Sequence, residues 1–324
     1  MTLVELIERF DSVERSIVVV NRTEPDPIHN LLVDTFGDDS VGVSDRTLPD
    51  RNALDGTGGS SDSRNATGES FGAGDGSLPT IETLVGDGSE SIDVDDLRDH
   101  DEIEFDGSTA AGIENLVLLL EDGEIVAVSR LDALVDAILL VNSDLYITGT
   151  RGLEDLELPS VITGLHDTVF TLRGYPESNR QKLLLITISR FIERVAWESG
   201  SGTLRSSFQR LSRLDDEIGT RRVYRQVVEA GVDTHVYGVP DRVPDDLGAT
   251  VHGGESIDFT DTWFVVFTPP DGPRAIDAAD DLRRGVDGGV ALLAVETEPR
   301  VWQGIWTFDP DRIRTVSDYV IENL

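Results

Sequence analysis

Three side chains on one predicted helix have the types and spacing needed for polar chemistry. Ser189 and Glu193 are four residues apart and share a helical face, and Arg190 can pair with Glu193 at i, i+3. Glu296 ends an apolar strand, where a buried carboxylate needs a partner such as Arg190 or Arg300. If Glu193 and Glu296 converged in a cleft, they could act as the acid and base of an enzyme.

Aromatic and amide side chains later in the chain could complete a pocket. Trp302, Gly304 and Trp306 alternate along a predicted strand, so both tryptophans share a face across a glycine, which predicts a groove between two aromatic walls. Gln209 follows Phe208 and could be a buried hydrogen-bonding group. Two interpretations are open, a core with a satisfied polar network or a ligand pocket. The candidate ligand-binding residues are Ser189, Arg190, Glu193, Gln209, Tyr224, Trp263, Glu296, Trp302 and Trp306.

Several other chemistries lack their sequence motifs. Cysteine is absent, which excludes thiol nucleophiles, disulfides and zinc–thiolate sites. No two of the five histidines stand at i, i+4, and no HExxH, GxSxG or Walker sequence occurs. The sequence therefore indicates no metal site and identifies no cofactor and no established catalytic residue.

The charge of the chain narrows its possible partners. The 324 residues include 62 acidic and 27 basic ones, for a net charge of −35, and Lys182 is the only lysine. Such a charge argues against non-specific nucleic-acid or anionic-membrane binding, which requires positive potential. No stretch approaches the roughly 18–20 apolar residues that span a bilayer. The acids in MTLVELIERF occupy positions where a signal peptide has basic residues, so we expect a cytoplasmic protein.

Acidic and glycine residues are concentrated in one part of the chain. Residues 37–112 contain 19 acids, 4 arginines and 13 of the 31 glycines, a net charge of −15. Because this composition offers little apolar surface, we predict a long acidic Gly/Ser/Asp-rich insertion that is largely flexible. Residues 1–36 and 113–324 would then form the folded domain, either as one body or as an N-terminal lobe 1–165 and a C-terminal lobe 166–324.

One segment reverses the sign of the charge. Residues 180–230 contain ten basic and six acidic side chains, a net charge of +4. This excess could form an intramolecular ion-pair network, or it could form a docking face for an acidic partner. The candidate docking residues are Arg194, Arg221, Arg222 and Arg225.

Hydrophobic periodicity predicts an α/β or α+β protein with a mixed β-sheet flanked by helices. Ser129 is expected to cap the helix that follows it, and Gly200 is expected to end the longest helix. The predicted helices are 3–10, 28–36, 129–141, 158–165, 176–198, 215–230 and one that begins at 310. The predicted strands are 16–21, 115–120, 124–128, 168–172, 234–239, 249–252, 263–268, 290–296 and 301–308.

Several strings, taken in order, resemble the DICT sensory domain, which is named for its occurrence with diguanylate cyclases and two-component systems. The strings are ISRFIE at 188–193, FQ at 208–209, Tyr224, HVYGVPD at 235–241, WFVVF at 263–267, LLAVE at 292–296 and WQGIWTFDP at 302–310. The resemblance covers 1–36 and 113–324, and the beginning is similar to stand-alone haloarchaeal members. It implies a sensory module of mixed α and β structure, found beside histidine kinases and regulators, for which a role in light response has been suggested.

These observations lead to one main hypothesis and two alternatives. The main hypothesis is a cytoplasmic signal-transduction module that acts through a partner, a histidine kinase or regulator, and that could also bind a small ligand. The alternatives are an enzyme that uses Glu193 and Glu296 as an acid/base pair and a purely structural adaptor. A sensor should contain an enclosed pocket of about 300 Å³ or more. An adaptor should expose an apolar patch. The ligand and the oligomeric state are left open.

The acidic composition, with arginine in place of lysine, indicates a protein from an extreme halophile. Because the Debye length shortens from about 8 Å at physiological salt to about 3 Å at 1 M, molar salt screens the repulsion between surface carboxylates. We predict that the chain loses its structure below about 1 M KCl. Far-UV circular dichroism along a KCl titration measures this, and full stability in dilute buffer would exclude the halophilic interpretation.

Overall fold

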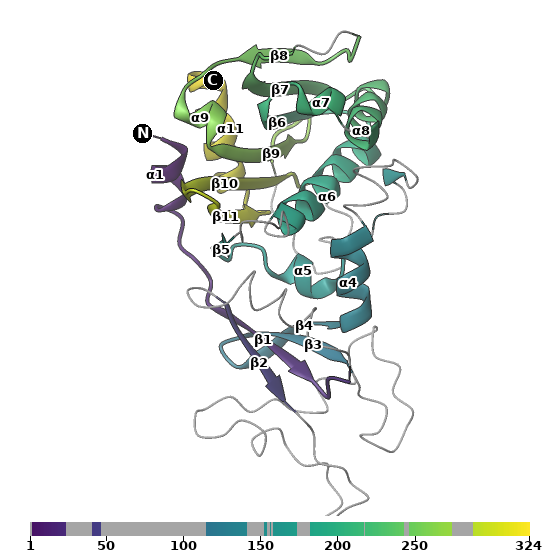
Figure 1. The fold of residues 1–324 in the computed structure, drawn as a ribbon, viewed down its shortest axis with the longest axis vertical. Helices are drawn as coiled ribbons and strands as arrows, with labels where there is room; N and C mark the ends of the chain where they lie inside the picture. The colour runs from purple at the N-terminus through teal and green to yellow at the C-terminus, as the bar shows by residue number, and fades with distance from the viewer. Residues whose placement is uncertain are drawn as a thin grey trace, which may run out of the picture.

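A computed structural model contains two mixed β-sheets flanked by helices, one above the other in Figure 1. This arrangement confirms the predicted class of mixed α and β structure. The predicted insertion 37–112 lies outside the described residues, except for 41–46. The residues that the structure describes are 2–23, 41–46, 115–140, 152–153, 156, 158–173, 182–216, 218–242, 246–273 and 288–324.

The smaller sheet has the strand order β2-β1-β3-β4. Its strands are β1 (Arg15–Val20), β2 (Val41–Arg46), β3 (Leu116–Glu121) and β4 (Glu124–Arg130). The pair β1–β2 is parallel and the other pairs are antiparallel. Between β3 and β4, Asp122 and Gly123 have φ of 52° and 83°, as a tight hairpin requires. Strand β2 falls within 37–112, so six residues of that segment belong to the sheet.

Two helices follow the smaller sheet, α4 (Leu131–Leu140) and α5 (Ser160–Gly164). The expectation that Ser129 caps α4 is wrong, because Ser129 lies inside β4. Its hydroxyl instead accepts a hydrogen bond from the backbone N–H of Val161 at 3.1 Å, at the beginning of α5. Ser129 therefore joins β4 to the helix that lies next to it in space.

The larger sheet has the strand order β5-β11-β10-β9-β6-β7-β8. The sequence did not predict β6, because its residues TLRSSFQR are mostly polar. The buried Ser207 of β6 donates to the carbonyl of Thr262 at 3.2 Å and accepts from the N–H of Phe264 at 2.8 Å. The strands are β5 (Phe170–Arg173), β6 (Thr203–Arg210), β7 (Asp233–Val239), β8 (Thr250–Gly253), β9 (Thr262–Thr268), β10 (Val290–Glu298) and β11 (Val301–Thr307).

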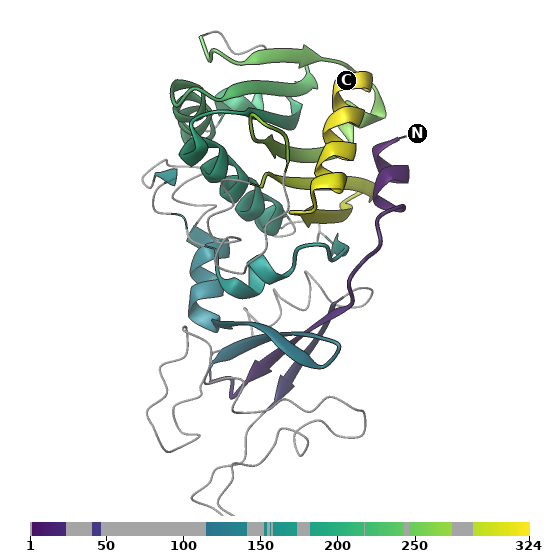
Figure 2. The ribbon, with the colours of Figure 1, turned by 180° about the vertical axis from the view of Figure 1, so that it is seen from behind.

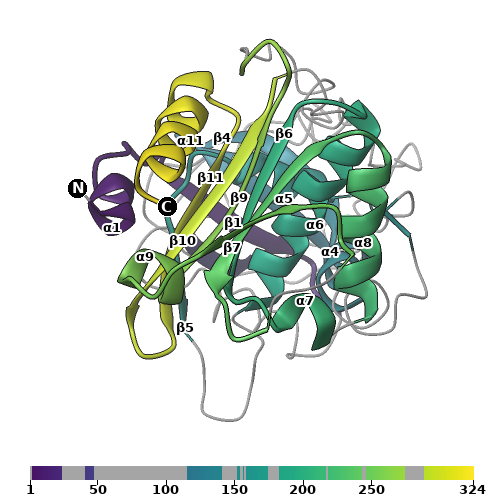
Figure 3. The same cartoon turned by 90° about the horizontal axis from the view of Figure 1, so that it is seen from above.

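Helices cover both faces of the larger sheet, as Figure 3 shows from above. One face carries α6 (Leu183–Ser199), α7 (Arg213–Asp216) and α8 (Ile218–Glu229). The other carries α1 (Leu3–Ile7), α9 (Ile257–Thr260) and α11 (Pro310–Asn323), which lie in front of the sheet in Figure 2. Helix α6 ends where predicted, at Gly200, whose φ of 60° is accessible to glycine at little cost.

Two hydrophobic cores follow from this layering. The first is continuous from one face of the smaller sheet, through α4 and α5, to α6 and the larger sheet. The second lies between the opposite face of the larger sheet and the helices α1, α9 and α11. Helix α1 therefore packs on the larger sheet, although β1, which follows it in the chain, belongs to the smaller one.

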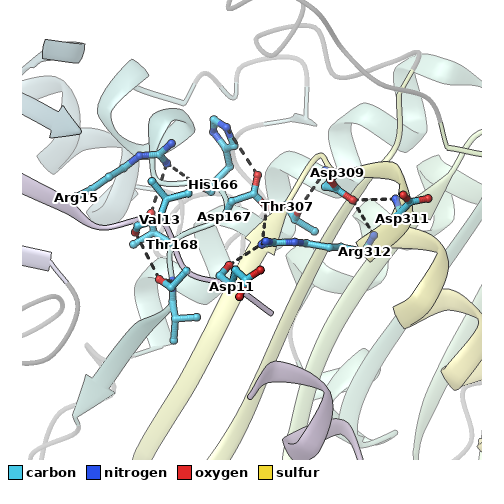
Figure 4. A network of polar contacts seen from close by, with 12 residues as sticks. Asp11, Val13, Arg15, His166, Asp167, Thr168, Thr307, Asp309, Asp311 and Arg312 are labelled. Carbon is cyan, nitrogen blue, oxygen red and sulfur yellow. Dashed lines mark hydrogen bonds and ion pairs between the residues drawn. The ribbon is translucent and has the colours of Figure 1, made fainter. Parts of the chain in front are cut away.

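A polar network joins the two sheets (Figure 4). Arg15 of β1 donates to the carbonyls of Gly164 and His166 at the end of α5. Asp167, one residue further, pairs with Arg312 of α11 at 3.1 Å and accepts the N–H of Val13 on its carbonyl at 3.0 Å. The segment that enters β1 and the segment that leaves α5 are thus fastened to each other and to α11.

The groove expected between the two tryptophans of β11 is filled. Trp302 and Trp306 do share a face, but both are fully buried in the first core. Phe170 of β5 pairs with Gly304 across the sheet, and a side-chain carbon on Gly304 would lie 2.6 Å from the Phe170 ring. The space between the tryptophans therefore accommodates a ring of the protein itself.

Gly304→Ala should lower the free energy of unfolding by about 1–3 kcal/mol, because the added methyl overpacks the site against Phe170. Gln303→Ala, on the neighbouring half-buried position of β11, is the control and should cost less. The double variant Gly304→Ala/Phe170→Leu should lose less free energy of unfolding than the sum of the losses of Gly304→Ala and Phe170→Leu, because the two residues are in contact. Denaturant unfolding at constant salt measures all four variants, and strict additivity would contradict the contact.

Candidate functional site

Helix α6 is buried along most of its length, and this burial determines the chemistry of its polar residues. Thirteen of its 17 residues are buried, Ser189, Arg190 and Glu193 among them. The helix lies between the larger sheet, α8 and α4 (Figure 1). A polar group in such a position is costly unless it is hydrogen-bonded, so each of these side chains needs a partner within the protein.

Arg190 and Glu193 neutralise each other, which confirms the predicted i, i+3 pair. Each is 2% exposed, and Nη1 of Arg190 donates to Oε2 of Glu193. Nη2 of Arg190 donates to the hydroxyl of Thr220 in α8 at 2.9 Å. Burial raises the pKa of Glu193 above its ordinary value, and the charge of Arg190 opposes this rise without cancelling it.

Tyr224 of α8 brings a phenol to the same place. Its side chain is 1% exposed, and its hydroxyl lies near Glu193 and Ser206 without a hydrogen bond of ordinary geometry to either. Burial, followed by the charge of Glu193, raises the pKa of Tyr224 well above its ordinary value. The phenol therefore keeps its proton and remains a potential hydrogen-bond donor.

Trp263 of β9 completes this side of the site. Its indole N–H donates to the hydroxyl of Ser189 at 2.9 Å, and that hydroxyl donates to the carbonyl of Leu185 at 2.7 Å. The Trp263 ring meets Trp302 edge to face, with 6.4 Å between the ring centroids. The ammonium of Lys182 lies 5.3 Å from the centroid of the Trp302 ring.

These side chains enclose a cavity of about 30 Å³ between α6, α8 and the larger sheet. A cavity needs about 10–15 Å³ to hold one water, so this one has room for a water or two or for a small ion. Five of the nine candidate ligand-binding residues line it. The full lining comprises Ile186, Ser189, Arg190, Glu193, Ser207, Phe208, Arg213, Tyr224, Trp263 and Val265.

The other four candidates lie elsewhere. Trp302 and Trp306 are in the core, and Gln209 is buried near the irregular end of β6 with a φ of 58°. Glu296 accepts the backbone N–H of Arg300 at 2.6 Å in the turn between β10 and β11, so Arg300 is its partner through the backbone. Because Glu296 does not line the cavity, the arrangement does not supply the acid/base pair considered for an enzyme.

The sequence missed two polar residues of the cavity, Ser207 and Arg213. Both depend on β6, which the polar pattern of its residues concealed. The string at Phe208 and Gln209 marked this region, and reading it as a strand would have placed Ser207 beside β9. No comparable local signal marked Arg213.

The candidate docking arginines mostly contact acids of the same chain. Arg194 pairs with Glu198 at 2.8 Å and also donates to the carbonyl of Leu156. Arg221 and Arg225 both approach Asp246, at 2.5 and 3.8 Å. The remaining candidate, Arg222, is exposed on α8. These contacts favour the interpretation of the positive segment as an internal ion-pair network.

Within the described part of the chain, no three or more His, Asp or Glu side chains are grouped so that they could hold a metal ion. None of the described helices is both long and apolar enough to cross a bilayer. Comparison of the chain with protein-family models, with curated proteins and with solved structures finds no match in any of the three.

Arg190→Met should lower the free energy of unfolding by about 3–5 kcal/mol at pH 8, because it leaves Glu193 buried without its counter-charge. A carboxyl whose pKa is raised in the folded state stabilises the protein below its unfolded pKa and loses this contribution as the pH rises through its folded pKa. The deficit of Arg190→Met should therefore shrink toward pH 5, where Glu193 can take up a proton.

The double variant Arg190→Met/Glu193→Gln is the matched control, because glutamine cannot ionise. Its deficit should be nearly independent of pH between 5 and 8. Thermal unfolding at constant salt measures both variants. Parallel pH profiles for the single and the double variant would contradict a buried carboxyl as the cause.

Proposed function

We propose that this protein is a cytoplasmic sensory and signal-transduction module that acts on a histidine kinase or regulator. The observation that carries the proposal is the convergence of Ser189, Arg190, Glu193, Tyr224 and Trp263 on one cavity. These residues come from α6, α8 and β9, and they belong to strings that resemble the DICT sensory domain. The proposal therefore joins that resemblance to a cavity built by the same residues.

The form of the cavity favours sensing over catalysis. Among the described residues that line it, Glu193 is the only carboxylate, and it is held by Arg190; Glu296 lies in β10 and does not line the cavity. The cavity of about 30 Å³ is far below the roughly 300 Å³ expected of a sensor, so that expectation is not met by this cavity. A cavity of this size suits a small ion or a small group of a larger ligand. A purely structural adaptor has less support, because the large apolar side chains exposed in the described part of the chain, Val126, Ile257 and Ile321, lie on three different elements.

Helix α6 offers a route from the cavity to the rest of the protein. It packs against α8 and β9 at the cavity and against α4, which leads to the smaller sheet. A change in the packing around Arg190 would therefore act on both sheets through one rigid element. In a sensory module, such a displacement would alter the surface that a partner recognises.

The proposal is tested with candidate histidine kinases and response regulators taken from the genome that encodes this chain. We expect the full-length protein to change the rate of kinase autophosphorylation or phosphotransfer several-fold in multi-molar KCl. Trp263→Phe, which removes the hydrogen bond to Ser189, should reduce this effect, because it alters the cavity while keeping an aromatic ring.

Glu229→Gln, an exposed substitution on α8 outside the candidate docking residues, is the control and should leave the kinase effect unchanged. Equal rates with and without the wild-type protein, together with no complex formation in size-exclusion chromatography, would rule out this function. This experiment measures the activity of the partner, so its outcome does not depend on knowing the ligand.

A further inference from the structure

We propose that the cavity is a binding site for a small monovalent anion, either a halide ion or the carboxylate group of a larger molecule. Arg213 and Tyr224 would hold the anion, and the rest of the lining would exclude larger groups. The inference rests on the proposed function in one respect, since it names the chemical class of the ligand that the sensory site would take.

The first argument is the charge of Arg213. This half-buried residue begins α7 and lines the cavity, and no carboxylate in the described part of the chain pairs with it. The neighbouring arginines Arg190, Arg194 and Arg221 each pair with an acid of the same chain. In a chain with a net charge of −35, acids are abundant, so an arginine that lines a cavity and has no carboxylate partner among the described residues favours a counter-charge supplied by a ligand.

The electrostatic potential beside the cavity is positive, because Lys182 and Arg213 lie close enough to affect each other. Burial lowers the pKa of Lys182, the charge of Arg213 lowers it further, and the opposing effect of Glu296 is smaller. Two half-buried cations thus repel each other beside the lining of the cavity. An anion bound at Arg213 would relieve this repulsion.

The third argument is the supply of hydrogen-bond donors. The hydroxyls of Ser189 and Ser207 already donate to backbone carbonyls, at 2.7 and 3.2 Å. Tyr224 is among the residues that line the cavity, and its hydroxyl is buried without a hydrogen bond of ordinary geometry. A phenol and a guanidinium are both donors suited to an anion. The charge of Glu193 is balanced by Arg190, so it does not close the site to an anion.

The size of the cavity limits the anion. A volume of about 30 Å³ admits an occupant comparable to a water or two, which a halide ion or a carboxylate group satisfies. A phosphate ester or a nucleotide is too large to enter. The cavity therefore favours small anions that carry a single negative charge.

The test is thermal unfolding of the full chain in concentrated sodium sulfate, whose divalent anion is too large for the cavity. Sodium bromide or sodium formate is then titrated into this background. We expect a saturable rise in Tm for the wild type, because a ligand that binds only the folded state stabilises it in proportion to ln(1 + [L]/Kd). A response to bromide alone would indicate a free halide ion, and a response to formate as well would indicate a carboxylate group.

Arg213→Gln should weaken the affinity at least tenfold, and Tyr224→Phe should weaken it several-fold. Arg210→Gln is the matched control, because Arg210 lies three residues away with its side chain 64% exposed, and it should retain the wild-type affinity. If Arg213→Gln does not fold, Tyr224→Phe provides the comparison. A linear, unsaturable rise with equal slope in all variants would be a general salt effect and would overturn the inference.

Crystals grown with bromide give a direct second measurement. An anomalous peak within hydrogen-bond distance of Arg213 is expected, and its absence from the cavity would overturn the inference. This failure is distinct from failure of the proposed function. If the protein regulates the kinase but binds no anion, only the anion-site inference is contradicted. If it binds the anion but has no effect on the kinase, only the proposed function is contradicted.

Discussion

The burial of α6 is the constraint on which the site depends. A buried charge without a counter-charge is strongly destabilising, and α6 carries two buried charged residues, Arg190 and Glu193. Their separation by three residues lets them neutralise each other within the helix itself. Nη2 of Arg190 donates to Thr220 of α8, so the same guanidinium also helps to position a second helix. The cavity occupies the space that this arrangement leaves between α6, α8 and β9.

The same logic operates where the two sheets meet. Arg15 is 9% exposed and places its charge against carbonyl groups at the end of α5, with Glu121 as its acid at 2.8 Å. Asp167 accepts the Thr307 hydroxyl and the Arg312 guanidinium through one carboxylate oxygen. Carbonyls and carboxylates that end helices and strands are thus used as partners for arginine. In a chain whose bases are almost all arginine, its several donors let one side chain join several elements at once.

The elements predicted correctly from the sequence are those with strong local signals. The apolar spacing of α6, the glycine that ends it and the turn between β3 and β4 are determined by neighbouring residues. Strand β6 was missed because it is mostly polar, and its buried Ser207 finds its hydrogen-bond partners on β9, at positions 55 and more residues away in the chain. The local sequence of a strand does not show which groups its polar side chains contact on the neighbouring strand.

The candidate site shows the same division. The pair Arg190–Glu193 was predictable because it lies within one helix. The groove at Gly304 was predicted wrongly, because the alternation of one strand does not reveal that Phe170 of another strand fills the space. Glu296 was correctly assigned a need for a partner, but a turn supplied a backbone N–H where a guanidinium was expected. Periodicity identifies the face on which a side chain lies, and the fold decides what meets it.

The path of the chain between the sheets has a consequence for how the protein can be divided. Helix α1 packs on the larger sheet, and strand β5 is one of its strands. The smaller sheet is built from residues that lie between these two elements in the chain. The chain leaves at Val13 and returns at Asp167, and these two points are joined by a hydrogen bond of 3.0 Å. The smaller sheet is therefore formed by an insertion in the chain, and the two connections of this insertion lie side by side. Adjacent connections are the geometry of domain insertion, but the inserted part shares the first core with the larger sheet, so exchanging it would also require that core to be rebuilt.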